Sequence, residues 1–305
     1  MDEPLTFETD FDAPAGQCQR LSPLVRRVVA GNGGPMTFTG TCTYLVGAGQ
    51  GGVAVIDPGP DDPAHVEALL AALSGDPVTA ILVTHTHRDH SPAAAPLARA
   101  TGAPVIGCAP HRAARPLAAG EVNRMEGAGD ASYAPARILV EGDACAGRDW
   151  HLEAVATPGH TANHLAFALR EEKALFSGDH VMAWSTSFVG PPDGNMADYM
   201  ASLEKLRGRD DVIYWPGHGG PVREPTRFVR ALMAHRRQRE AMIFARIAAG
   251  DATIPEIVRN VYPGLAPALH GAAALNVLAH LEDLAAREAV RVEGALDLDA
   301  HYHPA

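Results

Sequence analysis

The chain has 305 residues, and 36 Asp and Glu against 25 Lys and Arg give it a formal charge of −11. With 47% hydrophobic and 20% charged residues, its composition is that of a globular protein with a buried core, which excludes extensive disorder. The acidic balance also argues against a surface built throughout to hold nucleic acid.

The first part of the chain predicts strands alternating with helices. Short β-like runs and one continuous apolar run predict strands at 24–30, 42–46, 53–56 and 78–83. Asp62-Pro63 opens an amphipathic helix, and Ser91-Pro92 supplies an N-cap and a first helical residue for an Ala-rich helix. This alternation predicts an α/β protein.

The middle of the chain continues the pattern, with strands predicted at 138–140, 152–156, 165–169 and 212–215 and a helix at 197–206. After residue 222 the pattern becomes helical: a long helix at 226–249, a capping box at Thr253-Ile254-Pro255-Glu256, a helix at 272–284 and a short strand at 289–292. We therefore divide the chain into residues 1–222 and a winged-helix-like unit at 223–305. The His301-Tyr302-His303 tail is predicted to be disordered.

The cysteines and the N-terminal segment bear on the cellular setting. The four cysteines lie far apart, without a C-x-x-C pair for a zinc knuckle or a redox dithiol. The acidic start, MDEPLTFETDFD, lacks the features of a signal peptide, and no apolar run approaches the ~18 residues of a membrane span. We expect a reducing, cytoplasmic setting and no membrane partner.

A polar loop, THTHRDH, follows the strand at 78–83. His85 and His87 are two residues apart, so extended backbone projects both imidazoles to one side, while Asp89 and His90 fall at the entry of the next helix. Imidazole and carboxylate ligands suit zinc, with iron or manganese as alternatives. A lone His-x-His pair also occurs by chance, so this loop needs partners.

Three later strand ends supply such partners, namely Pro158-Gly159-His160, Ser177-Gly178-Asp179 and Pro216-Gly217-His218. The order and spacing of these pieces resemble the metal-binding signature of the metallo-beta-lactamase superfamily. The stretches ATPGHTANHLAF, YWPGHGGPV and TIPEIVRNVY narrow the resemblance to the beta-lactamase-like protein two group. It implies an αββα sandwich that carries two zinc ions and is followed by a C-terminal winged helix.

The resemblance also implies a role for each matching residue. His85, His87 and His160 would bind the first metal, Asp89, His90 and His218 the second, and Asp179 both. A hydroxide bridging the metals would be the nucleophile, and Asp89 would orient it and take its proton. Common antibiotic-cleaving lactamases have a cysteine in the second site, so the carboxylate here disfavours that activity.

Three further residues are candidates for support of the site. Asp57, which ends the strand at 53–56, could fix the tautomer of an imidazole, but a simple turn residue before Pro-Gly is an equal alternative. His164, four residues after His160, either supports the site or has a structural role. His180 either faces the cleft or packs beneath it.

Three classes of function are open: a hydrolase of a small ester, thioester or lactone, a single-strand endoribonuclease, and a metal-binding scaffold without turnover. Residues 223–249 hold seven arginines and two glutamates, which form either an RNA-binding face or a solvated helix. Residues 250–305 hold three arginines against eight acids, which disfavours duplex DNA. We expect a small-molecule substrate rather than RNA, and the sequence predicts no oligomeric state.

Overall fold

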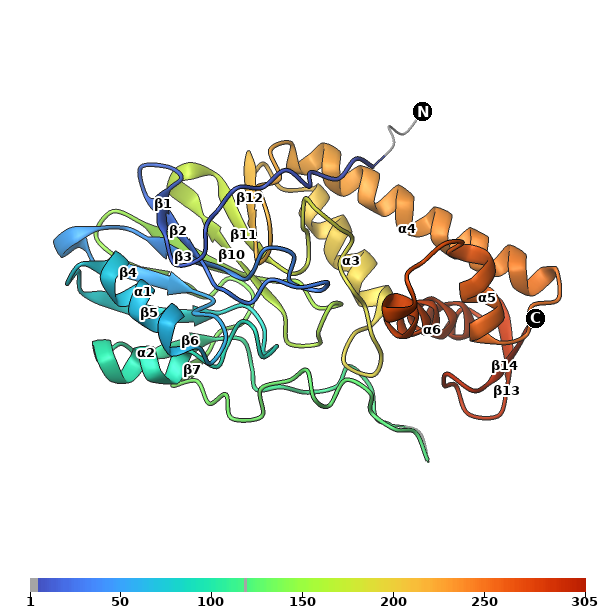
Figure 1. Ribbon diagram of the computed structural model, residues 1–305. Helices are drawn as coiled ribbons and strands as arrows, with labels where there is room; N and C mark the ends of the chain where they lie inside the picture. Colours follow the sequence, from blue (N-terminus) through green and yellow to red (C-terminus); the bar gives the residue numbers. More distant parts are fainter. Residues whose placement is uncertain (1–4, 118–119) are drawn as a thin grey trace.

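The structure is a computed structural model that describes residues 5–117 and 120–305. Two β-sheets pack against each other, and a helical unit follows at the C-terminal end of the chain (Figure 1). The prediction about a signal peptide depends partly on residues 1–4, which lie outside the described residues. No helix in the described part of the chain is long and apolar enough to cross a membrane.

The first sheet has seven strands in the order β1-β2-β3-β4-β5-β6-β7. They are β1 (Cys18–Arg20), β2 (Val25–Val29), β3 (Cys42–Val46), β4 (Val53–Ile56), β5 (Val78–Val83), β6 (Val105–Gly107) and β7 (Arg137–Ile138). Strands β1 to β4 pair antiparallel, and β4 to β7 pair parallel. Helices α1 (Pro63–Leu73) and α2 (Ala94–Thr101) make the crossovers between parallel strands.

One prediction in this sheet is wrong in detail. Helix α2 begins at Ala94 and not at Pro92, and Ser91 does not cap it. The Ser91 hydroxyl donates instead to Asp130 Oδ2 at 2.7 Å. The tertiary partner outcompetes the local cap, so the residues before α2 form a turn.

The second sheet has five strands in the order β12-β11-β10-β9-β8. They are β8 (Ala144–Ala146), β9 (His151–Ala156), β10 (Leu165–Leu169), β11 (Ala174–Gly178) and β12 (Ile213–Pro216), with α3 (Met196–Arg207) between the last two. Strands β11 and β12 are parallel, so their carboxyl ends meet at one edge of the sheet. Short 3-10 helices lie at Gly49–Gly51, Arg170–Glu172 and Pro267–Leu269.

The main core lies between the sheets, where Phe167 and Phe176 of the second sheet join Leu45 and Ile81 of the first. Burial of each such side chain stabilises the fold by roughly 1.5–3 kcal/mol. A second core covers the outer face of the second sheet with apolar residues of α3 and α4 (Pro225–Ala248). The predicted αββα arrangement is confirmed.

Helix α4 contributes to two cores. Val229 and Leu232 pack on the sandwich, and Ile243 and Ile247 pack in the C-terminal unit. That unit also contains α5 (Ile254–Val261), α6 (His270–Ala286), β13 (Val290–Glu293) and β14 (His301–Pro304). The division of the chain at residue 222 stays a prediction, because the helix that follows belongs to both cores.

The prediction of a disordered tail at His301 and His303 is wrong. Strand β14 pairs antiparallel with β13, and Tyr302 between the two histidines is 1% exposed. The Tyr302 N–H also donates to the Ala252 carbonyl at 2.9 Å. A single buried aromatic residue between polar neighbours therefore anchors the C-terminal ribbon.

Candidate metal centre

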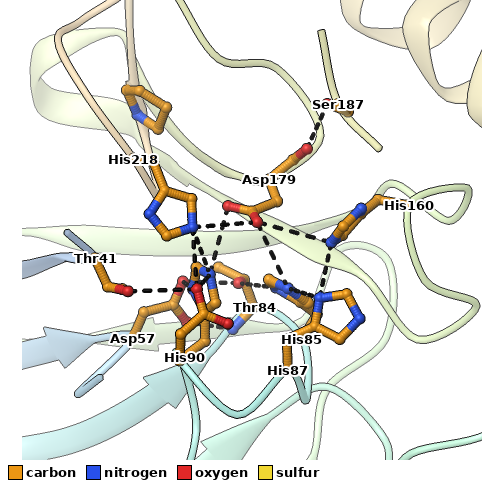
Figure 2. Close-up of polar contacts among 12 residues, drawn as sticks. Thr41, Asp57, Thr84, His85, His87, His90, His160, Asp179, Ser187 and His218 are labelled. Atoms are coloured by element: carbon orange, nitrogen blue, oxygen red, sulfur yellow. Dashed lines mark hydrogen bonds and ion pairs between the residues drawn. The ribbon is translucent and has the colours of Figure 1, made fainter. Parts of the chain in front are cut away.

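Loops from four strands converge at one edge of the sandwich (Figure 2). The loop after β5 carries the His85 to His90 segment, and the turn after β9 carries His160. Asp179 and His218 follow β11 and β12 directly. Because these strands end at the same edge, residues far apart in the sequence meet there.

The structure brings together all seven residues for which the sequence predicted metal ligation. Their ligand atoms form two groups, each with its atoms within 4.8 Å of one another: His85, His87, His160 and Asp179, and then Asp89, His90 and His218. In the first group, His87 Nδ1 lies 3.1 Å from His85 Nε2 and 3.0 Å from His160 Nε2. In the second, His218 Nε2 lies 3.3 Å from His90 Nε2 and 3.1 Å from Asp89 Oδ2.

Asp179 lies between the two groups (Figure 2). Its Oδ2 is 3.7 Å from His160 Nε2 in the first group and 3.4 Å from His218 Nε2 in the second. Its Oδ1 is 3.4 Å from His90 Nε2 and has no hydrogen-bond partner. One carboxylate therefore contacts both halves of the site.

The outer nitrogens of the rings show which atoms are free to bind a cation. His160 Nδ1 lies 2.6 Å from the Phe188 carbonyl oxygen, and His218 Nδ1 lies 3.2 Å from that of Gly40. A carbonyl oxygen only accepts, so each Nδ1 carries a proton, and each Nε2 faces inward, where it offers a lone pair whenever the ring is neutral. Inward lone pairs about 3 Å apart cannot bond to one another, so this donor set fits a metal with N and O ligands.

Asp57 lies behind the second group. Its Oδ2 is 2.9 Å from His90 Nδ1, and its two oxygens accept from the Thr84 backbone N–H and hydroxyl at 2.8 Å each. The Thr84 hydroxyl is also 3.0 Å from His85 Nδ1. The structure thus places Asp57 against the His90 ring, in line with the first of the two alternatives that the sequence left open, and adds Thr84, which the sequence did not single out.

His164 lies outside both groups and supports the loop that carries Asp179. Its Nε2 accepts the Asp179 backbone N–H at 3.2 Å, so its Nδ1 carries the proton and donates to the Thr157 hydroxyl at 2.8 Å. His180 packs beneath the site, fully buried, with its ring 4.6 Å from that of Tyr199. Neither of the two belongs to a ligand group.

The three imidazoles of the first group are held neutral. Burial, together with neighbouring imidazoles, lowers the pKa of His85 well below its usual value and the pKa of His87 to about 3. Burial also lowers the pKa of His160. Three unprotonated rings are therefore available to a metal at neutral pH.

The second group is charged. Burial would lower the pKa of His218, but Asp179 and Asp89 outweigh it and raise the pKa to about 9. The carboxylates of Asp89, Asp179 and Asp57 likewise overcome burial and raise the pKa of His90 well above its usual value. Against the opposing effect of burial, His90 and His218 lower the pKa of Asp89 well below its usual range. The protons on His90 and His218 thus supply the positive charge that a metal ion would supply in the second group.

Asp89 is the most accessible of the seven. Its side chain is 24% exposed, whereas the side chains of Asp179 and His160 are 9% and 5% exposed. An ionised carboxylate that solvent reaches can exchange a proton with bulk water, which the enclosed ligands cannot.

A glycine allows the close approach of the two groups. A Cβ at Gly217 would lie 2.4 Å from Asp179 Oδ1 and 2.7 Å from His90 Cε1. This explains the glycine directly before His218 and is a signal that the sequence contained.

The arginines of residues 223–249, for which the sequence left an RNA-binding face and a solvated helix open, differ in exposure and in partners. Arg236 is 2% exposed, and Arg239 donates to the Val261 carbonyl at 2.9 Å while lying over the Tyr262 ring. Arg227 pairs with Glu224, and Arg246 with Asp251. Among Arg236, Arg237 and Arg239, Arg237 alone is exposed. The burial of Arg236 reduces the basic surface of this helix, but Arg223, Arg227 and Arg230 are exposed, so neither alternative is excluded.

Two sequence families match the chain. The metallo-beta-lactamase superfamily matches residues 36–218, and the beta-lactamase associated winged helix domain matches residues 253–300. The two matches correspond to the sandwich and to the C-terminal unit.

Individual proteins are similar over most of the chain. An atrochrysone carboxyl ACP thioesterase of Aspergillus fumigatus is 30% identical over 79% of this chain and 74% of its own length. A beta-lactamase-like protein 2 homolog of Caenorhabditis elegans is 29% identical over 87% of this chain and 85% of its own. A solved beta-lactamase domain protein from Burkholderia ambifaria has the same fold, with a TM-score of 0.82, 23% identity and coverage of 97% of this chain and 96% of its own.

Proposed function

Because the chain belongs to the metallo-beta-lactamase superfamily of hydrolases, we propose that it is a dinuclear zinc hydrolase of a small ester, thioester or lactone. The observation that carries the proposal is the inward convergence of imidazole nitrogens around Asp179, whose carboxylate contacts both groups. When bound, two divalent ions would supply Lewis acidity, lowering the pKa of water toward ~7 and polarising a substrate carbonyl.

The residues of the chain would bind the ions, orient the ligands and transfer a proton. His85, His87 and His160 would hold the first ion, His90, His218 and Asp89 the second, and Asp179 both. Asp57 and the carbonyls of Gly40 and Phe188 hold the outer ring nitrogens and so orient the inner nitrogens toward the position of a bound ion. Asp89 is ionised and partly exposed, so its carboxylate would orient the attacking water, accept its proton and pass it to solvent.

A thioester is the first substrate to test. The Aspergillus fumigatus relative is named a thioesterase. A departing thiol has a pKa of about 8.5, so a thiolate leaves with little help from an acid, whereas an alkoxide needs more. The Trp184 ring stacks on Phe38 at 4.9 Å, and both lie against Gly219, the residue after His218. This pair offers an apolar wall for an acyl group beside the second group.

The test is a substrate panel with zinc-loaded protein: an acyl-N-acetylcysteamine thioester, a p-nitrophenyl ester, a lactone and an end-labelled single-stranded RNA. We expect turnover of at least one of the first three, with Asp89→Asn as the inactive control. Metal-dependent cleavage of the RNA at catalytic enzyme concentrations, lost in Asp89→Asn, would replace the proposal by the endoribonuclease alternative. No turnover of any substrate with two ions bound would favour the scaffold.

A further inference from the structure

Arg236 in α4 is a buried cation without an acidic partner. It is 2% exposed, and no Asp or Glu of the described residues lies within ion-pair distance of it. Its Nη2 donates to the Ser187 carbonyl, its Nη1 donates to Asn276 Oδ1 at 3.3 Å, and its guanidinium lies 5.1 Å from the centre of the Tyr199 ring. Burial of a charge that only peptide dipoles and an aromatic ring compensate is costly in free energy. The groups that Arg236 contacts indicate what this cost supports.

The peptide that Arg236 holds is attached to the candidate metal centre. The Ser187 hydroxyl lies 2.5 Å from the Asp179 carbonyl and 2.7 Å from that of His180, so it restrains the backbone from which the shared carboxylate projects (Figure 2). The next carbonyl along the chain, that of Phe188, accepts from His160 Nδ1 at 2.6 Å. One short segment thus positions both Asp179 and His160.

A second contact of Arg236, with the Tyr199 ring, also leads to the backbone next to Asp179. The Tyr199 ring lies against the guanidinium of Arg236, and its hydroxyl donates to the His180 carbonyl at 3.1 Å. His180 directly follows Asp179, so both routes from Arg236 end on the backbone beside the shared carboxylate.

The C-terminal unit takes part through Asn276, which is on α6. Arg236 therefore connects α6 to the loop that carries Phe188, and through it to His160. Within the described residues, the polar contacts of Arg236, Ser187 and Phe188 do not reach Asp89, His90 or His218.

We propose that Arg236 is a positioning residue for the metal centre, a role that rests on the proposed metal binding. It touches no ligand atom, but it holds the 187–188 peptide and so orients His160 and Asp179. The docked C-terminal unit completes this support through Asn276. Removal of Arg236 should therefore lower the affinity for the first ion, which both His160 and Asp179 would bind, more than the affinity for the second ion, which Asp179 alone of the two would bind.

The experiment measures zinc affinity at each site by chelator competition, with cobalt substitution spectra to assign the sites. Arg236→Gln should lower the affinity for the first ion at least tenfold and that for the second less. Arg236→Lys should recover part of the loss, because an ammonium can donate to the Ser187 carbonyl but lacks the fork that also reaches Asn276. Arg237→Gln, which changes the exposed neighbour, should keep both affinities within twofold.

A control separates positioning from general loosening. Arg239→Gln removes the contacts of Arg239 with the Val261 carbonyl and the Tyr262 ring, which lie within the C-terminal unit. It should lower Tm while leaving both zinc affinities near wild type. Equal affinity losses in Arg239→Gln and Arg236→Gln at the same loss of Tm would overturn the proposal, as would a folded Arg236→Gln protein with wild-type affinities.

Ser187→Ala tests the route from Arg236 to Asp179. If the two residues act in series, the double variant Arg236→Gln with Ser187→Ala should bind zinc as tightly as the single variant that has the larger loss of affinity. Additive losses in the double variant would contradict the route. Wild-type protein is measured first. Failure of wild-type protein to bind zinc would reject the metal centre and with it this role, whereas two bound ions and an unaffected Arg236→Gln would reject this role alone.

Discussion

The two halves of the candidate centre are built from similar residues but differ in charge. Burial keeps the rings of the first group neutral, with the pKa of His87 lowered to about 3. In the second group, Asp89 and Asp179 overcome burial and raise the pKa of His218 to about 9. The types of ligand residue alone therefore do not determine the protonation state of a group, because the positions of the carboxylates decide which imidazoles hold a second proton.

This difference predicts how the two ions bind. A metal entering the first group meets lone pairs, whereas a metal entering the second must displace protons from His90 and His218. Zinc affinity at the second group should therefore rise with pH up to about 9, the pKa of His218, while affinity at the first group changes less.

Asp179→Ala should have the largest effect, because it removes the one side chain that both groups share. No other carboxylate of the described residues contacts both groups, so at least one ion should be lost. Turnover should fall by more than the ~10²–10⁴-fold that loss of a general base causes. The check is elemental analysis beside turnover. Two retained ions in the variant would show that the halves bind independently.

Asp89→Asn should leave the fold intact and reduce turnover by ~10²–10⁴-fold, because an amide cannot take a proton. Circular dichroism and metal content serve as controls. If the variant keeps both ions and turns over at the wild-type rate, Asp89 is a ligand only. The second group then contains no general base, and in this respect the two groups do not differ.

Asp57→Asn should weaken the second group selectively. The residue has a φ of +51°, which Asn tolerates well, so the turn is preserved. Loss of the charged acceptor for His90 Nδ1 should lower zinc affinity of the second site by ~10–100-fold and leave the first site near wild type. Equal losses at both sites, measured by chelator competition, would show that Asp57 supports the whole edge of the sheet.

The pH dependence of stability in the metal-free protein should show the smallest effect. The pKa of His218 is raised to about 9 from 6.5, so its stabilisation is complete below pH 6.5 and is lost as the pH rises toward 9. The pKa of His87 is lowered from 6.5 to about 3, so protonation of the unfolded chain destabilises the fold as the pH falls below 6.5. Thermal unfolding should therefore give a maximum near pH 6.5 without metal. A Tm that rises steadily from pH 6.5 to 9 would contradict the charge assignment.

The strands and the inward-facing residues were predictable because they leave local patterns. Apolar runs ending in Gly- and Asp-rich turns mark β5, β9 and β12, and the polar residues at these ends are those that converge. The carbonyls of Gly40 and Phe188, which fix two of the rings, were not predictable because every residue has a carbonyl and sequence does not show where it points.

Arg236 shows a pattern that was present but was interpreted as a surface charge. Val229, Leu232, Met233 and Arg236 follow the i, i+3, i+4, i+7 spacing of one helical face, and all four are buried. The arginine lies on the apolar stripe, so periodicity indicated its burial although its charge suggested exposure. Conversely, the single Tyr302 was too weak a pattern to predict β14.

The dinuclear centre is tested most simply by the zinc content of folded wild-type protein after reconstitution and removal of loosely bound metal. We expect close to two equivalents per chain at pH 8. One ion should be lost before the other as the pH is lowered toward 6, because protons compete with the metal for His90 and His218 in the second group. Less than half an equivalent in a folded sample at pH 8 would contradict the dinuclear centre. Loss of both ions in a single step would contradict the difference between its halves.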